Sequence, residues 1–205
     1  MEGRLVLVEP LAAEHEAGLL GAGHDQDMWA YLTAFPDPYR TPERFHQWMQ
    51  AALAETVAGR EGAWAIIDRA SGAPIGSTRY LALRPEHHGF EVGWTWVGRR
   101  WWRTGANVET KLLLLDRAFE VLGCERVELK TDARNVRSRA AIEALGAQFE
   151  GVFRRHMKIP GGWRDTAWYS VIRPEWPTVR DALRARLARH DLTAHAPARD
   201  STDGG

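Results

Sequence analysis

Val92-Gly93-Trp94-Thr95-Trp96-Val97 runs directly into Gly98-Arg99-Arg100-Trp101-Trp102-Arg103-Thr104-Gly105-Ala106-Asn107, where a helical pattern begins. Apolar side chains then recur at spacings of 4, 3, 4 and 3 residues, at Val108, Leu112, Leu115, Phe119 and Leu122. This periodicity is typical of one buried helix face. Gly123 follows, at the place where a helix favours a left-handed residue. The stretch therefore predicts a strand, a loop and a helix over 105–122.

The loop before this helix has the features of an anion site. A helix start exposes backbone N–H groups and the positive end of the helix dipole. Gly105 would let the backbone approach an anion closely, and we expect a side chain there to crowd it. Arg99, Arg100 and Arg103 add positive charge. The loop therefore suits a phosphate or pyrophosphate, although a capped helix after a surface loop would look the same.

The two familiar phosphate-loop motifs are absent from the sequence. No G-x-x-x-x-G-K-[ST] occurs, which excludes a P-loop nucleoside triphosphatase. No G-x-G-x-x-G follows the first strand, which argues against a dinucleotide-binding fold.

The rest of the chain alternates strand and helix patterns. Strands are predicted at 4–9, 63–68, 74–83, 89–97, 126–131, 147–157 and 164–172, and helices within 11–31, 41–58, 135–145 and 177–190. Three consecutive strands, a long helix and a further strand predict a mixed sheet with one parallel crossover. We expect an α/β (α+β) fold, one domain over 1–190 with a mostly antiparallel sheet of about six or seven strands flanked by helices, and a disordered tail over 191–205.

Composition limits the kinds of partner. The chain has 205 residues, formal net charge zero and one cysteine, Cys124. Neutral charge gives no reason to expect nucleic acid or an anionic membrane as the main partner. A single cysteine cannot form an internal disulfide, which fits a reducing compartment. No signal peptide opens the sequence and no apolar run reaches a bilayer-spanning length, so we expect a cytoplasmic protein.

Several motifs in order resemble one enzyme family. They are Glu91–Trp94, Trp102–Glu109, Arg126-Val127-Glu128, Lys130-Thr131-Asp132, Asn135–Ser138, Leu145-Gly146-Ala147, Glu150-Gly151 and Trp163–Thr166 leading to Tyr169-Ser170. Together they are similar to the GNAT acetyltransferases, and more narrowly to the RimJ/RimL-like branch, over about residues 4–176. The resemblance implies acetyl-CoA as co-substrate, no metal, and transfer of an acetyl or related acyl group to a primary amine, such as a protein N-terminal α-amino group.

The resemblance also implies which residues contact coenzyme A. The family loop is usually Q/R-x-x-G-x-G/A, whereas here the first position is Trp102 and the last is Asn107, so only Gly105 matches strictly. Backbone contacts do not depend on the side chain. The implied contacts are Trp96, Val97, Trp102, Arg103, Thr104, Gly105, Ala106, Asn107, Asn135 and Ser138.

Three residues are candidates for the proton transfers that amide formation requires. Ser138 shares a stripe with apolar residues and by resemblance lies near the thiol, which makes it the candidate proton donor to the thiolate; a plain capping pair with Asn135 is the alternative. Glu91 is the candidate base, often acting through water in this family, unless it only pairs with an arginine. Tyr169 is a second candidate acid, or a half-buried sheet tyrosine. His156 could be a base, or be solvated or structural.

Other residues leave their roles open. Trp29, Phe45 and Trp48 could wall the acceptor groove or pack in the core. Trp94, Trp96, Trp101 and Trp102 could form a homodimer surface or be core. His87-His88 has no metal-ligand spacing.

Two further readings of the whole chain remain open. One is a module that binds acyl-CoA without catalysis. The other is a nucleic-acid binder that uses the arginine cluster, against which the neutral overall charge counts.

Overall fold

A seven-stranded sheet forms the centre of the molecule. The structure, a computed structural model, describes residues 1–25, 28–32 and 41–194. The strands are β1 (Val6–Pro10), β2 (Gly62–Asp68), β3 (Pro74–Arg84), β4 (Gly89–Val97), β5 (Arg126–Asp132), β6 (Gln148–Ile159) and β7 (Gly162–Ile172). Their order is β1-β2-β3-β4-β5-β7-β6, and among these strands only β4 and β5 pair in parallel. The predicted mixed, mostly antiparallel sheet is confirmed.

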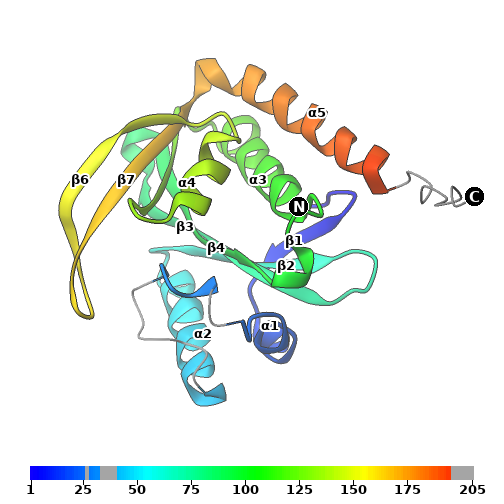
Figure 1. Cartoon of the computed structure of the whole chain (residues 1–205), viewed down its shortest axis with the longest axis vertical. Coiled ribbons are helices and arrows are strands. Elements are labelled where there is room, and N and C mark those ends of the chain that lie inside the picture. The colour runs from blue at the N-terminus through cyan, green and yellow to red at the C-terminus, as the bar shows by residue number, and fades with distance from the viewer. Residues whose placement is uncertain (26–27, 33–40, 195–205) are drawn as a thin grey trace, which may run out of the picture.

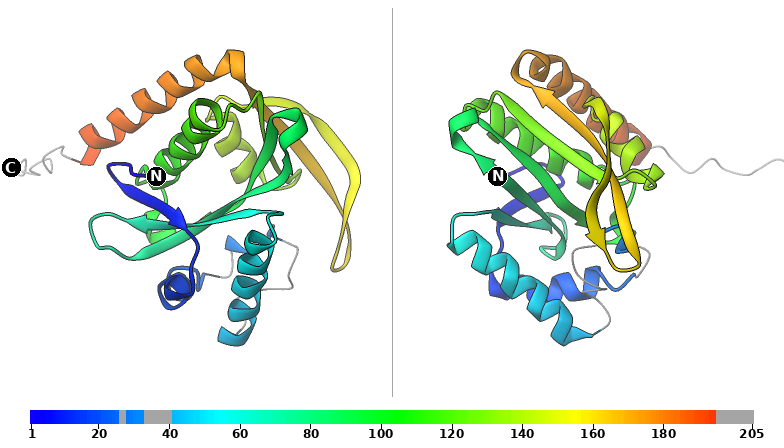
Figure 2. Two further views of the ribbon diagram at one scale, coloured as in Figure 1. Left: turned by 180° about the vertical axis from the view of Figure 1, so that it is seen from behind. Right: turned by 90° about the vertical axis from the view of Figure 1, so that its left-hand side faces the viewer.

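Helices cover both faces of the sheet. The helices α1 (Glu16–Ala22) and α2 (Pro42–Val57) lie on one face, and α3 (Ala106–Asp116), α4 (Val136–Glu143) and α5 (Trp176–Ala194) lie on the other (Figures 1 and 2). The predicted start of α2 is confirmed, since the Thr41 hydroxyl accepts the Arg44 N–H at 3.4 Å. The last helix continues to Ala194, into the range predicted as a tail, and residues 195–205 lie outside the described part of the chain.

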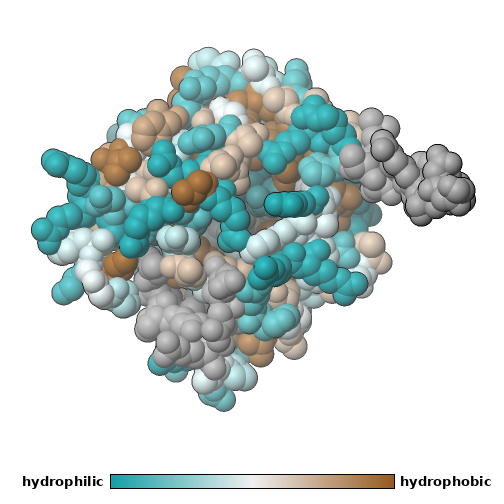
Figure 3. Space-filling model, viewed as in Figure 1, coloured by the Kyte–Doolittle hydropathy of each residue, from teal (hydrophilic) through white to brown (hydrophobic). Residues whose placement is uncertain are grey.

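Two apolar cores lie on the two faces of the sheet. The larger core, under α3, includes Val127, Leu129 and Tyr169. The smaller core, under α2, contains Phe45 and Trp48 of that helix, with Trp48 packed against Trp96. Trp29 packs there too, against Trp96, but it lies in a turn after α1 and not in the predicted helix. Core packing therefore accounts for these aromatic residues. The face seen in Figure 1 is mostly hydrophilic, with scattered apolar residues (Figure 3).

The end of the long helix differs from the prediction. The α3 helix passes into a π-helical turn at Arg117–Val121. A π turn holds more residues than an α turn, so it rotates the following side chain away from the apolar stripe. Leu122 is consequently 46% exposed, and its predicted place on the buried face is wrong. Gly123 has φ +66°, which confirms the predicted left-handed helix end.

Strands β4 and β5 form a fork. They pair only at Gly89–Arg126, Phe90–Val127 and Glu91–Glu128 within the described chain, and beyond Glu91 they separate. A bulge in β4 lies just after this point, where the register with β3 shifts and Trp94 has φ +50°. Because β4 then pairs only with β3, and β5 only with β7, the two backbone edges that face the fork stay open.

Candidate active site

The fork is the candidate site because two helix N-termini meet there. Helix α3 follows β4 through the loop at 98–105, and α4 follows β5 through a short turn. Polar backbone groups on open strand edges and at helix starts need partners from water or a ligand. The fold thus gathers unpaired backbone donors and acceptors around one opening in the sheet.

The mouth of α3 has the backbone geometry of an anion site. Arg103 has φ +64° and Gly105 has φ +92°, and the first helical N–H that bonds back is that of Glu109, to Gly105 O at 2.9 Å. The preceding amides therefore belong to the open end of the helix, where the Thr104 N–H makes only a long contact, of 3.5 Å, with Trp101 O. Arg103 is exposed, and no ion pair involving it occurs in the described chain, so its charge is available to an anion.

The structure gives a reason of its own for a glycine at 105. An added Cβ would lie 2.9 Å from Leu5 Cδ1 and 3.6 Å from His190 Cβ, both in the protein. A side chain here would therefore meet the protein itself, and the expectation that it would also crowd a bound anion stays a prediction. The glycine is needed for its left-handed backbone and for packing at the start of the helix.

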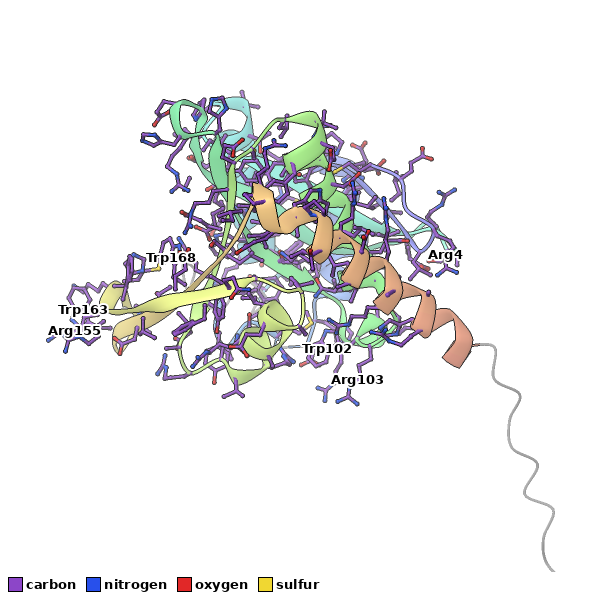
Figure 4. All side chains as sticks on the ribbon, turned by 90° about the horizontal axis from the view of Figure 1, so that it is seen from above. Arg4, Trp102, Arg103, Arg155, Trp163 and Trp168 are labelled. Carbon is purple, nitrogen blue, oxygen red and sulfur yellow. The ribbon has the colours of Figure 1, made fainter. Side chains whose placement is uncertain are left out.

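Side chains of the loop hold it in shape. The Thr104 hydroxyl donates to Trp101 O at 2.7 Å and accepts the Ala106 N–H at 3.4 Å. Trp102 Nε1 donates to Val97 O at 2.8 Å, and the Arg137 guanidinium of α4 lies 4.1 Å from the Trp102 ring centroid. Trp102 therefore ties the loop to β4 and contacts α4, beside Arg103 (Figure 4).

The other implied cofactor residues contribute in different ways. The Asn107 Oδ1 atom is buried and has no hydrogen-bond partner among the described residues. The side chains of Trp96 and Val97 are buried in the two cores, so only their backbone lies at the fork. At α4, Asn135 Oδ1 accepts the Ser138 N–H at 3.0 Å, which confirms the predicted capping pair. Ser138 is half-buried.

Glu91 lies at the point where the strands part. It is only 2% exposed, and its carboxylate is 2.6 Å from Lys130 Nζ. Burial raises the pKa of Glu91, while Lys130 opposes the shift. Gly93 leaves room for the carboxylate, because a Cβ there would be 2.7 Å from Oε1. Glu91 thus has an ion-pair partner, although a lysine rather than the arginine considered from the sequence.

Tyr169 lies on the opposite face of the sheet from Glu91. It is fully buried among core residues, where its hydroxyl accepts from Arg139 Nε and donates to Glu143 Oε1, each at 2.9 Å. Burial raises the pKa of Tyr169. The structure therefore does not bring Tyr169 and Glu91 into one cluster.

The sequence analysis missed several charged residues around the fork. Lys130 lies 5.1 Å from the Trp168 ring centroid, on the face of Glu91. His156, which the sequence analysis did name as a possible base, lies on this face too, with Nδ1 3.1 Å from Thr166 Oγ1 and its ring 5.5 Å from that of Trp168. Burial, and then the charges of Lys130 and Arg164, lower the pKa of His156. Alternation along β5 could have placed Lys130 on this face.

A buried lysine lies behind the fork on the α3 side. Lys111 is 5% exposed, and its Nζ donates to Thr95 Oγ1 at 2.7 Å, next to the β4 bulge. Burial lowers the pKa of Lys111 from 10.5 to about 7, with Glu91 opposing the shift. Thr95 also shares a hydrogen bond with Thr78 at 2.7 Å.

Comparison with known proteins identifies the family. A model of the acetyltransferase (GNAT) domain matches residues 4–148, which include β1 to β5, the α3 mouth and α4. The chain belongs to the GNAT acetyltransferase family. GNAT acetyltransferases use acetyl-CoA as co-substrate, and the open mouth of α3 fits the diphosphate of that molecule.

Individual relatives agree with this assignment. The uncharacterised N-acetyltransferase p20 of Bacillus licheniformis is 26% identical over 152 residues, covering 74% of this chain and 84% of that protein. A GCN5-related N-acetyltransferase structure from Brucella melitensis is 34% identical with TM-score 0.83, covering 91% of this chain and 84% of that one. The chain is therefore similar to N-acetyltransferases over most of its length.

A more distant structure shares the fold alone. The ribosomal-protein-S5-alanine acetyltransferase of Vibrio fischeri is 18% identical with TM-score 0.69, covering 86% of this chain and 97% of that one.

Two other features bear on the sequence predictions. In the part of the chain that the structure describes, no helix is both long and apolar enough to cross a membrane. Nor do the described residues contain three or more His, Cys, Asp or Glu side chains arranged to hold a metal ion.

Proposed function

We propose that this GNAT enzyme transfers an acetyl or related acyl group from acyl-CoA to a primary amine, and that the amine is a protein N-terminal α-amino group. The observation that carries the proposal is the fork between β4 and β5, with open strand edges facing the open amides of α3. A thioester carried on a long amide-containing arm needs such an edge for its amides and such a mouth for its phosphates.

The geometry supports a binding role for several residues. The amides from Arg103 to Asn107 and the Arg103 side chain would hold the diphosphate. The backbone of Trp96 and Val97 and the Asn135 side chain would line the arm, and the unpartnered Oδ1 of Asn107 supports a ligand at this end. Trp102 and Thr104 act by shaping the loop.

The proposed chemistry needs two proton transfers. The amine nitrogen attacks the thioester carbonyl carbon, the C–S bond breaks, and the amine loses a proton. Glu91 takes that proton, through water, because its raised pKa brings it closer to that of an α-amino group near 8. Ser138 gives a proton to the leaving thiolate, and its half-buried place at the start of α4 supports this role. Tyr169 is the second candidate donor.

The acceptor assignment rests on the RimJ/RimL-like resemblance. Its support from the structure is the fold shared with a ribosomal-protein acetyltransferase. A small-molecule amine is the alternative acceptor. A module that binds acyl-CoA without transfer is the alternative function. A cytoplasmic location and a homodimer stay predictions from the sequence.

A thiol-release assay tests the proposal. Acetyl-CoA and succinyl-CoA are each incubated with peptides that carry free or blocked N-termini and with small primary amines. We expect release of free coenzyme A with free N-termini and not with blocked ones. Release only with small amines would contradict the peptide acceptor. Tight binding of acetyl-CoA in calorimetry, with no release across the panel, would instead indicate the non-catalytic module.

A further inference from the structure

A buried arginine on the Glu91 face has no hydrogen-bond or ion-pair partner among the described residues. Arg164 lies on β7 and is 8% exposed, and its Nε is buried without a hydrogen bond. Within the described residues, no hydrogen bond or ion pair reaches any part of its guanidinium. An arginine keeps its charge at any ordinary pH, so burial without a partner destabilises the fold. Such an unpaired cation is a candidate binding group.

The carboxylates near Arg164 are already occupied. Its charge is influenced by Asp132 and Glu91, which attract it, and by Arg134, which repels it. Asp132, however, is held by Arg134 through Nε at 3.0 Å and Nη2 at 2.7 Å. Glu91 is bound to Lys130 at 2.6 Å. With these two ion pairs formed, the positive charge of Arg164 is the one in this group of five residues that no carboxylate neutralises.

The other buried arginine of this sheet face shows the contrast. Arg79 on β3 is 4% exposed, and its Nε and Nη2 are likewise buried without a hydrogen bond. Its Nη1, however, donates to Glu61 at 3.0 Å, and its guanidinium lies 5.2 Å from the Trp48 ring centroid. The fold therefore supplies an anion and an aromatic ring to one buried arginine and leaves the other without either. Burial of arginine alone does not explain Arg164.

The place of Arg164 connects it with the proposed reaction. Residues alternate along β7, so Arg164 and Trp168 share the face of Glu91, opposite Tyr169. The coenzyme is proposed to enter from the α3 side of the sheet. The amine must then reach Glu91 from the opposite face, which carries Trp168 and Arg164. The rest of the acceptor therefore lies beside Trp168, which stacks on Phe153 at 4.9 Å, and within reach of Arg164.

We propose that Arg164 binds a carboxylate of the substrate, and that the acceptor is a primary amine that carries a carboxylate near its amino group. This inference rests on the proposed acyl transfer. A planar guanidinium matches a planar carboxylate through two parallel hydrogen bonds. Asp132 and Glu91 close by favour a single negative charge over a phosphate dianion. The motif Trp163–Thr166, which the proposed function leaves unexplained, then has a role in substrate selection.

Matched acceptors test the inference. With acetyl-CoA, the protein is given β-alanine or β-alaninamide, and peptides that begin with Asp or Asn but are otherwise identical. We expect kcat/KM to be about 10-fold or more higher for the carboxylate member of at least one pair. Arg164→Gln should remove this preference and leave the neutral amine within about 3-fold of its original rate. Arg154→Gln, at an exposed arginine of the same hairpin, is the control and should keep the preference.

A carboxylate could also come from the acyl group, and a second arm separates the sources. With β-alaninamide as acceptor, succinyl-CoA is compared with acetyl-CoA. A preference for succinyl-CoA that Arg164→Gln removes would assign the carboxylate to the acyl donor and keep the role of Arg164. No thiol release with any amine would reject the proposed function itself. Release without any carboxylate preference would reject only this inference.

Stability distinguishes a binding role from a structural one. Since the described part of the chain gives the Arg164 guanidinium no hydrogen bond or ion pair, Arg164→Met should raise the melting temperature, whereas loss of a structural arginine would lower it. The melting temperature of the original protein should rise on adding β-alanine, and that of Arg164→Met should not. A lower melting temperature for Arg164→Met, or equal loss of activity for charged and neutral acceptors, would overturn the assignment.

Discussion

The two faces of the sheet meet at the same fork but use different chemistry. On the α3 side, the groups aimed at the opening are mainly backbone amides and strand edges, shaped by Gly105 and Thr104. On the other side they are charged and aromatic side chains, namely Glu91, Lys130 and Trp168. Backbone groups tolerate sequence change, so a Trp at 102 and an Asn at 107 need not disturb coenzyme binding. On the face of Glu91, by contrast, side chains would determine which amine is accepted.

Each face also contains a buried cation that has no ion pair among the described residues, Lys111 on one face and Arg164 on the other, and the fold accommodates them differently. Lys111 can lose its proton, so burial lowers its pKa to about 7 and a single hydroxyl suffices as partner. Arg164 cannot lose its proton and requires an anion from outside. The comparison predicts that Lys111 affects stability in a pH-dependent way, whereas Arg164 affects the choice of substrate.

The largest effect is expected at Glu91, where the two faces meet. Glu91→Gln should lower kcat by about 10²- to 10⁴-fold, the usual contribution of a general base. Coenzyme A affinity in calorimetry should change little, since the mouth of α3 is untouched. In the original protein kcat should fall as pH drops through the raised pKa of Glu91, above the ordinary range for a glutamate. Glu86→Gln, at an exposed glutamate before β4, is the control. A loss of kcat under 3-fold would remove Glu91 as the base.

The next effect concerns the free energy of unfolding. The Lys111 pKa is about 7 in the folded protein and 10.5 ordinarily, so the unfolded chain binds this proton more strongly. Burial of the charged lysine therefore lowers the free energy of unfolding. This loss is complete below pH 7 and disappears as pH rises toward 10.5. Lys111→Met should therefore increase the free energy of unfolding at pH 7 by up to about 4 kcal/mol, less about 1 kcal/mol for the hydrogen bond to Thr95.

Urea unfolding at pH 7 and pH 9.5 measures this difference. The gap between Lys111→Met and the original protein should shrink at the higher pH. Lys158→Met changes an exposed lysine of β6 and should show no such trend. A gap of equal size at both values would mean that packing, rather than titration, determines the effect of Lys111.

The backbone character of the α3 side is tested at Gly105. A valine at φ +92° and 2.9 Å from Leu5 should cost about 1–3 kcal/mol in strain and displace the amides around it. We expect coenzyme A affinity to fall by about 10-fold, at 1.4 kcal/mol per tenfold change. Gly72→Val introduces the same side chain at φ +69° in a turn with open space around it, and should leave affinity unchanged. Equal affinities in calorimetry for both variants would separate this loop from coenzyme binding.

Local sequence patterns predicted where helices and strands lie. The contacts that they missed depend on how segments distant in the sequence pair in the folded chain. Thr41 before Pro42 and Gly123 after the long helix act within one turn of chain, so the sequence shows where those helices begin and end. The Glu91–Lys130 pair depends on the register of β4 with β5, which alternation cannot determine. The isolation of Arg164 depends on Arg134 taking Asp132, a choice among partners that only the packed structure reveals.

The smallest effect is expected at the two candidate proton donors, which lie in different surroundings. Ser138 is half-buried at the start of α4, whereas the Tyr169 hydroxyl already has Arg139 and Glu143 as partners. Ser138→Ala should therefore lower kcat by about 10-fold, with little change in coenzyme A affinity. Tyr169→Phe should mainly lower stability, by about 1 kcal/mol for the lost hydrogen bonds. If Tyr169→Phe instead lowers kcat more than Ser138→Ala does, the proton comes from the core side, and the fork alone does not contain the reaction.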